Sequence, residues 1–457
     1  MQALAGLWQR GGMPSEALAF AQLAGADPVF PSSFAVGTAA QSTIAAAALA
    51  ACELGHVRGT PRQQVAIDML HAAVECTGWF SLDGRVPDPW DAFSGLYRCA
   101  DGHVRIHANF AHHREGALRL LGLDPATAKR SDAEAALLNW RALDFEEAAA
   151  QRKLVATALR RFDQWDATPQ GQAIAAQPLF TIDRIGEAPP LALPPLRDDA
   201  RPLTGLRVLD LTRILAGPVG GKALAAHGAD VMLVNSPVLP NIEAIADTSR
   251  GKLSAHVDLK TDAGRATLRH LVGDAHVFTQ GYRPGGLSEL GFGPAALAQA
   301  RPGIVYVSLT AYGTQGPWAT RRGFDSLVQT AMGFNHAEGE AAGDAAKPRP
   351  MPMQILDEAT GYLMAFGAAA ALCRQQREGG SWHVQVSLAQ TGQWLRGLGR
   401  VADGLTQARP PVEPWLEPSD SGFGRLLAVR HSALLARTPA GWPRPSMPPG
   451  SSAPVWP

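Results

Sequence analysis

The chain has 457 residues with 41 basic and 41 acidic side chains, so its formal charge at neutral pH is zero. This balance gives no general attraction to nucleic acid or to an anionic membrane surface, and we expect neither as a partner. The four cysteines show no CxxC spacing, which disfavours a zinc module and is typical of a reducing compartment. The length predicts two or three domains.

No segment predicts a membrane span or a signal sequence. Met1 to Gly12 lacks a basic start followed by an apolar core, and the apolar run from Ala45 to Cys52 is too short to cross a bilayer. We therefore expect a cytoplasmic protein. Because the cysteine spacing disfavours a zinc module, we also expect no bound metal.

Residues 1–186 predict a mixed region of helices and short strands. A short helical pattern covers Pro14 to Ala24, and an alanine-rich helix from Gln41 to Cys52 precedes a strand at Gln64 to Ile67. The segment Tyr97 to Asn109 predicts a hairpin around a turn at Asp101-Gly102. Helical patterns follow in His113 to Leu121, Ser131 to Ala142, Phe145 to Arg161 and Gln164 to Ala176.

The order of helix, polar turn and strand recurs later in the chain. There the helix is Gly361 to Cys373 and the strand is His383 to Val386, which indicates a repeated unit, although two alanine-rich helices can also match by chance. Within the first copy, no carboxylate occurs between Asp27 and Glu53. We therefore expect the first copy to carry no nucleophile.

Residues 187–202 are rich in proline and predict a semi-rigid linker. Residues 203–400 then alternate strands and helices, which predicts an α/β fold with a doubly wound parallel sheet. The expected strands are 206–212, 231–235, 276–280 and 304–309, and the expected helices are 219–227, 262–272 and 294–300. Residues 401–457 form a tail rich in proline and tryptophan, which we expect to be loop-like.

Ligands of such sheets bind at the carboxyl ends of the strands. The sequence Gly217 to Lys222 superficially fits a phosphate-binding P-loop, but its spacing is one residue short and Ala223 replaces the required Ser or Thr. No GxGxxG is present, so a dinucleotide cofactor has no support.

Asp357 lies where a proline-bent apolar segment leads into the alanine-rich helix. The first turn of a helix carries free N–H groups and a positive dipole end, so a carboxylate there is expected to be ionised and able to act as a nucleophile. The alternative is that Asp357 only caps the helix.

An ordered set of motifs resembles the family III coenzyme A transferases. The motifs are Leu203 to Thr212 with Ala216-Gly217-Pro218, His227 to Val231, Ser249 to Lys252, Val257 to Lys260, Tyr282 to Gly285, Tyr306 to Ser308, Tyr312 to Pro317 and Gly323 to Asp325. Asp357 follows where the family keeps its catalytic aspartate. The resemblance implies the family's large doubly wound domain with a smaller α+β domain, and coenzyme A as co-substrate with no permanently bound cofactor.

The resemblance also implies roles for further residues. It places Lys260, the turn Gly281-Tyr282-Arg283, Arg322 and the backbone of Ile214-Leu215-Ala216 against coenzyme A, and it allows Asp325 to orient or assist Asp357. For each basic residue the alternative is a solvated surface charge, and for Asp325 it is a surface carboxylate favoured by the helix dipole.

Relative to the family, the chain presents its halves in reverse order, as a permuted or partly duplicated layout with the small-domain half first. Family members form interlocked dimers, so a homodimer is expected unless one chain supplies both parts of a site. The chain departs from the family at Asn235-Ser236-Pro237, Gln385 and Gln390, where acidic residues are usual.

The resemblance favours transfer of coenzyme A from an acyl-CoA to a carboxylic acid through an aspartyl anhydride and an aspartyl-CoA thioester. An acyl-CoA racemase is the second hypothesis, but Phe324 stands where racemases have a histidine and His336 is out of register. The third hypothesis is a non-catalytic acyl-CoA-binding protein.

Overall fold

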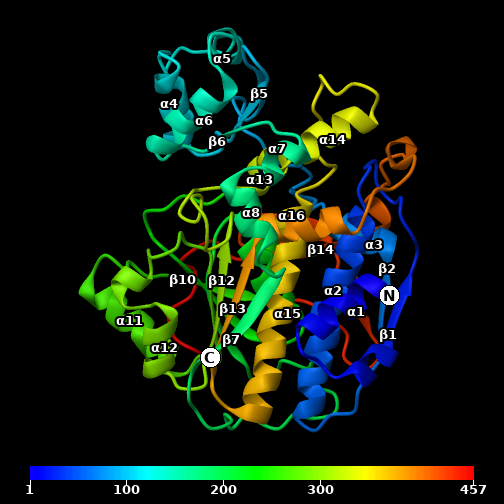
Figure 1. The fold of residues 1–457 in the computed structure, drawn as a ribbon. Coiled ribbons are helices and arrows are strands. Elements are labelled where there is room, and N and C mark those ends of the chain that lie inside the picture. The colour runs from blue at the N-terminus through cyan, green and yellow to red at the C-terminus, as the bar shows by residue number, and fades with distance from the viewer.

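A seven-stranded sheet forms the centre of the protein in the computed structural model, which describes all 457 residues (Figure 1). Its strand order is β10-β9-β8-β11-β12-β13-β7, and every neighbouring pair is parallel except β13 with β7. The strands are β7 (Phe180–Gly186), β8 (Arg207–Leu211), β9 (Asp230–Asn235), β10 (Lys252–His256), β11 (Val277–Gln280), β12 (Val305–Thr310) and β13 (Ser381–Ser387). The predicted α/β fold with a large, mostly parallel sheet is confirmed.

Helices cover both faces of this sheet. On one face lie α2 (Val36–Val57), α9 (Ala216–Ala226) and α15 (Ile355–Glu378), and on the other lie α11 (Asp262–Gly273) and α12 (Pro294–Ala300). Successive residues of β8 point to opposite faces, so Val208 joins the core under α15 while Leu209 joins the core under α11. Both faces are apolar, which explains why these strands read as continuous hydrophobic runs.

The two alanine-rich helices, α2 and α15, pack side by side although they come from opposite halves of the chain (Figure 1). Helix α15 is long and apolar enough to cross a membrane, but 94% of its most apolar window is buried inside the protein. Its composition therefore reflects a core helix surrounded by other elements.

Residues 91–160 form a separate α+β unit, here called the subdomain. It contains the antiparallel strands β4 (Gly95–Arg98), β5 (His103–Ile106) and β6 (Ala156–Ala158) with helices α4 (Ala111–Leu120), α5 (Arg130–Leu137) and α6 (Ala142–Gln151). Twelve buried residues make its own core. The subdomain stands at the top of Figure 1, against the start of α13 (Asp325–Met332).

The predicted hairpin is present as β4 and β5, but the helix expected at Phe145 to Arg161 ends at Gln151. Lys153 adopts a positive φ of 59°, which a helix cannot continue through, and the chain then enters β6. The helix expected over Pro14 to Ala24 is also wrong, because a 3₁₀ helix at Ser15–Phe20 leads into strand β1 (Ala21–Ala24).

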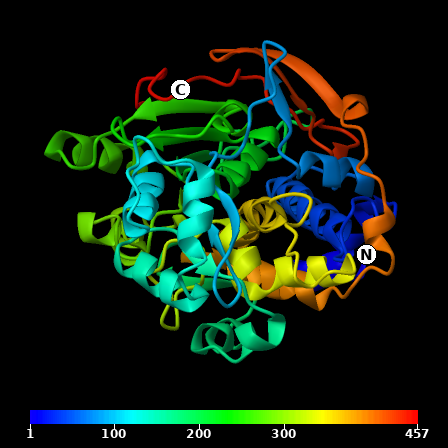
Figure 2. The ribbon, with the colours of Figure 1, turned by 90° about the horizontal axis from the view of Figure 1, so that it is seen from above.

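The C-terminal tail contains strands rather than only loops, which corrects the sequence expectation. β14 (Leu416–Ser421) and β15 (Gly424–Val429) form a hairpin that pairs with β3 (Phe80–Leu82). β16 (Leu434–Leu435) adds to β2 (Val65–Asp68), which also pairs with β1. The tail crosses the body beside the large sheet (Figure 2), where the Trp456 indole donates to the carbonyl of Leu271 at 3.0 Å.

The remaining helices are short and connect these layers. They are α1 (Gln2–Arg10), α3 (Met69–Glu75), α7 (Phe162–Asp166), α8 (Pro169–Ala175), α10 (Ile245–Thr248), α14 (Phe334–Ala341) and α16 (Leu388–Gly397).

Candidate active site

Asp357 is the third residue of α15 and is 9% exposed. The residue before the helix is Gln354, whose side chain makes no capping hydrogen bond. Because Asp357 already has helical backbone geometry, it does not occupy the N-cap position, and the capping interpretation is wrong. The Asp357 carboxylate therefore does not cap the helix.

Asp325 lies directly beside Asp357. It is the first residue of α13 and is fully buried, which rules out the alternative of a surface carboxylate. Its Oδ2 accepts a hydrogen bond of 2.9 Å from the backbone N–H of Asp357, and its Oδ1 accepts one of 2.5 Å from Gln329 Nε2. Asp325 thus satisfies a free N–H at the start of α15 and fixes the position of the Asp357 backbone.

The pair is held in an environment that favours protonated carboxyls. Burial, together with the charges of Asp325 and Glu358, raises the pKa of Asp357 well above its ordinary value. Burial likewise raises the pKa of Asp325 to about 6 and that of Glu358 to about 8. The sequence predicted an ionised Asp357 at the helix start, but loss of hydration outweighs the helix dipole here.

A cleft with a cavity of about 360 Å³ opens at the carboxyl ends of the central strands. Among the residues predicted to bind coenzyme A, it is lined by Ile214, Gly281, Tyr282, Arg283 and Arg322. These residues follow β8 and β11 or precede α13, so the order of strands in the sheet brings them together.

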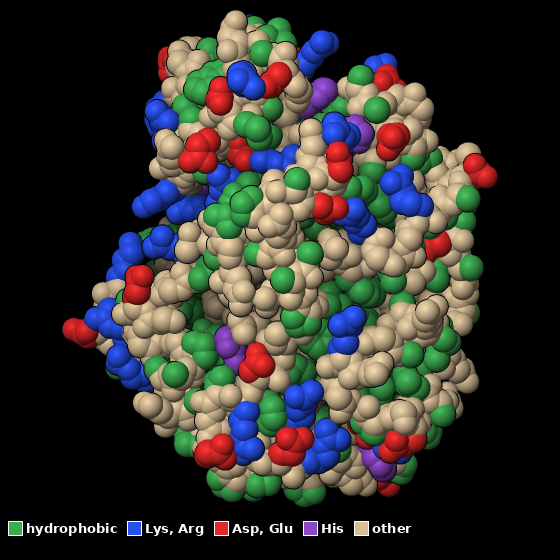
Figure 3. Space-filling view, in the orientation of Figure 1, with side chains coloured by type: hydrophobic (Ala, Val, Ile, Leu, Met, Phe, Trp, Pro, Cys, Tyr) green, Lys and Arg blue, Asp and Glu red, His purple; other side chains and the backbone are tan.

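Four arginines line this cleft, namely Arg213, Arg283, Arg321 and Arg322. Their charges make it suitable for a ligand that carries several phosphates. Figure 3 shows Lys and Arg side chains gathered below the subdomain, at the level where it meets the body. Sequence reasoning missed Arg213 and Arg321, although Arg213 directly follows a predicted strand.

Three other predicted contacts are not among the lining residues of the cleft. Ala216 is buried as the first residue of α9, Leu215 precedes it as the half-buried N-cap, and Lys260 is exposed after β10 at the edge of the sheet. The structure therefore does not bring Lys260 to the basic cleft.

The subdomain supplies the other wall of the cleft. Phe110, His112 and His113 line it, and Arg322 donates to the carbonyl of Lys153 at 3.2 Å. Below the cleft, His107 stacks on Phe324 with ring centroids 4.0 Å apart. Sequence reasoning missed these residues, although the two histidines of the predicted hairpin and the two directly after it offered a signal.

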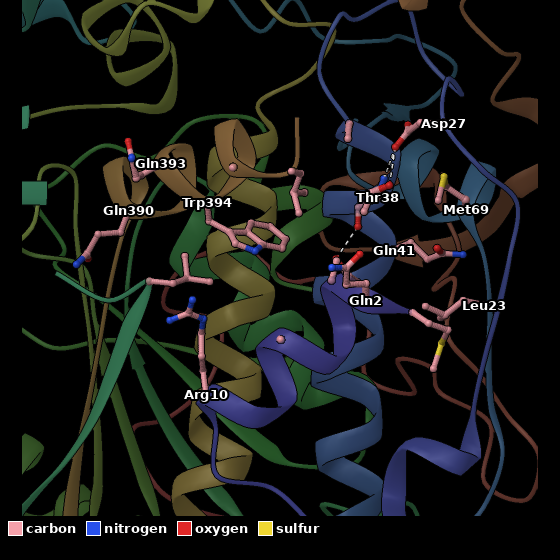
Figure 4. A pocket seen from close by; sticks show the side chains of 18 of the residues that line it. Gln2, Arg10, Leu23, Asp27, Thr38, Gln41, Met69, Gln390, Gln393 and Trp394 are labelled. Carbon is pink, nitrogen blue, oxygen red and sulfur yellow. Dashed lines mark hydrogen bonds between the residues drawn. The ribbon is translucent and has the colours of Figure 1, made fainter. Parts of the chain in front are cut away.

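A second cavity, of about 830 Å³, lies elsewhere, between α1 and the start of α2 on one side and α16 on the other (Figure 4). Thr38 is the third residue of α2, the position that Asp357 has in α15. Its backbone N–H and its hydroxyl donate to Asp27 Oδ2 at 2.8 and 2.7 Å. Asp27 is therefore hydrogen-bonded to the start of α2 as Asp325 is to the start of α15.

The fold and the site together define a class. The class is an α/β protein whose arginine-lined cleft at the strand ends offers positive charge to an anionic ligand, and Phe324 in the cleft lining directly precedes the buried Asp325. No group of three or more His, Cys, Asp or Glu side chains is arranged to hold a metal ion.

Residues 203–411 match the family described as CoA-transferase family III, which bears out the family resemblance of the sequence motifs. An acyl-CoA transferase of Gibberella moniliformis is 30% identical over 377 residues, which is 74% of this chain and 66% of the relative. A succinate–glutarate CoA-transferase of Agrobacterium fabrum is 33% identical over 52% of this chain and 65% of its own length. The chain thus spans slightly less than two thirds of these two relatives.

Among solved structures, a CAIB/BAIF family protein from Brucella suis is 28% identical and matches with a TM-score of 0.39. The match covers 50% of this chain and 65% of that chain.

Proposed function

We propose that the protein transfers coenzyme A from an acyl-CoA to a carboxylic acid, with Asp357 as the nucleophile. The observation that carries this proposal is the pairing of Asp357 with Asp325 next to an arginine-lined cleft, in a chain that matches this family. The Asp357 side chain does not cap α15, so its carboxylate is available to react. The arginines of the cleft would bind the phosphates of coenzyme A and direct the thioester toward Asp357.

The reaction begins when ionised Asp357 attacks the thioester carbonyl, which forms a mixed anhydride and releases the coenzyme A thiolate. The thiolate attacks the aspartyl carbonyl, so the first carboxylic acid leaves and an aspartyl-CoA thioester remains. The acceptor carboxylate attacks this thioester, and the released thiolate then attacks the acyl carbonyl of the new anhydride. The products are the new acyl-CoA and free Asp357, and no proton or electron is left unbalanced.

The environment of Asp357 fits this chemistry in one respect and opposes it in another. A raised pKa makes the carboxylate more basic and so more nucleophilic once it has lost its proton, but it lowers the ionised fraction at neutral pH. We expect activity to increase with pH until this group is fully ionised.

We further propose a layout in which residues 1–186 supply the small-domain half and carry no nucleophile, residues 187–202 are the linker, and residues 203–400 are the catalytic half. The position of Thr38 supports this, since it occupies the place of Asp357 in the first alanine-rich helix. One chain would then provide both walls of the site. A cytoplasmic location and a homodimer remain proposals that fractionation and light scattering would test.

Incubation of the protein with acetyl-CoA, followed by mass spectrometry of its peptides, tests the function. We expect a coenzyme A adduct, or a hydroxamate after hydroxylamine treatment, on the peptide that contains Asp357. Deuterium exchange at the α-carbon of a 2-methylacyl-CoA without any adduct would instead indicate a racemase. If neither an adduct nor exchange is found, the protein would be a non-catalytic acyl-CoA-binding protein.

A further inference from the structure

Arg105 is a buried arginine without a partner. Three arginines of the chain are buried, and two of them are paired: Arg160 with Glu146 at 2.7 Å and Arg250 with Asp247 at 2.6 Å. Arg105 is 6% exposed, its Nε has no hydrogen-bond partner, and its guanidinium forms no ion pair within 4.0 Å. A buried guanidinium without a counter-charge is costly, so an anion from outside the chain is the simplest partner for it.

The position of Arg105 links it to the candidate active site. It lies on β5, two residues before His107, so the two side chains share the face of the strand that packs toward α13. His107 stacks on Phe324, the residue before Asp325. The Arg105 guanidinium also lies over the Trp90 ring, 5.1 Å from its centroid. Arg105 therefore faces the start of α13 from the subdomain side.

The only nearby charge that favours its protonated form is Asp325, although the two groups are too far apart for an ion pair. Burial lowers the pKa of Arg105 to about 10, so it keeps its charge at neutral pH. The histidines beside it add no charge, because burial lowers the pKa of His107 and of His113 to about 3.

These surroundings select the kind of anion. One fixed cation over the Trp90 ring, with the Asp325 carboxyl nearby, suits a group with a single negative charge that accepts paired N–H bonds from a guanidinium. A phosphate has more charge than this site balances, and the four arginines of the neighbouring cleft already provide for phosphates. A carboxylate is therefore the anion that fits.

We propose that Arg105 binds a second carboxylate, at the far end of the acyl group, and that the substrates are dicarboxylic acids and their coenzyme A monothioesters. The inference rests on the proposed function, which places the reacting carboxyl at Asp357. Arg105 would then be a specificity-determining residue supplied by the subdomain, with Trp90 and His107 enclosing the chain between the two ends of the substrate.

The test compares dicarboxylic acids of four to six carbons with monocarboxylic acids of equal length as acceptors, with acetyl-CoA and succinyl-CoA as the two donors. We expect the wild type to prefer the diacids. Arg105→Met should raise KM for diacids by about 10- to 100-fold, the range expected for a lost charged hydrogen-bonded contact, and leave KM for monoacids within about twofold. Arg105→Lys should recover part of the preference, because it restores the charge without the planar fork.

Arg160→Met is the matched control, since it removes a buried arginine of the same subdomain that has a partner. It should lower the melting temperature, because Glu146 keeps only its longer ion pair with Arg321, whereas Arg105→Met should melt at or above the wild type. Calorimetry can measure the binding of a free diacid without turnover. Binding to the wild type that is lost in Arg105→Met would support the proposal.

Equal loss for diacids and monoacids, or no change for either, would overturn the dicarboxylate assignment. A wild type that binds both acid classes equally would overturn it as well. Failure of the proposed function has a different signature, because the wild type would then transfer coenzyme A to no acid at all.

Discussion

Replacement of Asp357 by Asn removes a carboxylate and keeps its shape. The side chain caps nothing and lies beside Asp325 and Glu358, so the substitution removes a group whose charge is opposed by its surroundings. We expect Asp357→Asn to be at least as stable as the wild type. A neutral amide is not a nucleophile toward a thioester, so kcat should fall on the order of 10⁴-fold or more with acyl-CoA binding retained.

The size of the stability effect depends on pH, and the sign follows from the raised pKa. The folded protein holds the Asp357 proton to higher pH than the unfolded chain does, so stability from this group is complete below about pH 4 and is lost as pH rises through the folded pKa. Each raised pKa unit corresponds to about 1.4 kcal/mol. We expect the advantage of Asp357→Asn to be near zero at pH 4 and to grow as pH rises toward the folded pKa, by at most about 1.4 kcal/mol per pH unit.

Urea titrations between pH 4 and pH 8 would measure this difference in the free energy of unfolding, and a coupled assay of acyl-CoA formation would measure transfer. Asp357→Ala is the control for side-chain volume. An Asn variant that keeps near-normal transfer would remove Asp357 as nucleophile. An Asn variant less stable than the wild type at pH 8 would refute the electrostatic account.

Two further predictions concern the cleft and the sheet. Arg283→Ala should raise KM for acyl-CoA about tenfold with little change in kcat. Lys260 lies outside the cleft, so Lys260→Ala should change neither KM nor kcat. Steady-state kinetics of both variants would test this. Asp210→Asn breaks a fully buried 2.8 Å ion pair with Lys252 and should cost about 3–5 kcal/mol in urea titration. The ion pair between Arg85 and Glu243 is exposed, so Glu243→Gln should cost less than about 1 kcal/mol. Equal costs for Asp210→Asn and Glu243→Gln would contradict this ranking.

The central strands and helices of the second half could be predicted closely from the sequence. Buried parallel strands are short apolar runs separated by amphipathic helices, and this local pattern places β8, β9, β11 and β12 within a residue or so. Strand β7 was missed because it pairs across about two hundred residues with β13 and carries no pattern of its own.

The candidate site could be predicted only in part. The positions of Asp357 and Asp325 at helix starts followed from local sequence, but their contact and their raised pKa values depend on burial by distant elements. Lys260 was predicted to contact coenzyme A from its position in a motif; it follows the edge strand β10 and is not among the residues that line the cleft. Arg105 is buried because the subdomain packs against α13, and no local pattern records that packing.

The contact between α9 and α15 determines which wall of the site can move. A side chain on Gly361 would collide with the carbonyl of Ala216, and one on Gly220 would lie 2.8 Å from the carbonyl of Gly361, so the two helices meet backbone to backbone. Asp357 and the loop after β8 are therefore parts of one rigid block. The opposite wall, formed by the subdomain, packs on this block through the His107–Phe324 stack and through ion pairs from Arg321 to Glu146 and Glu147. Under the proposed function, acyl groups of different length would be accommodated by a shift of the subdomain, while the geometry around Asp357 stays constant.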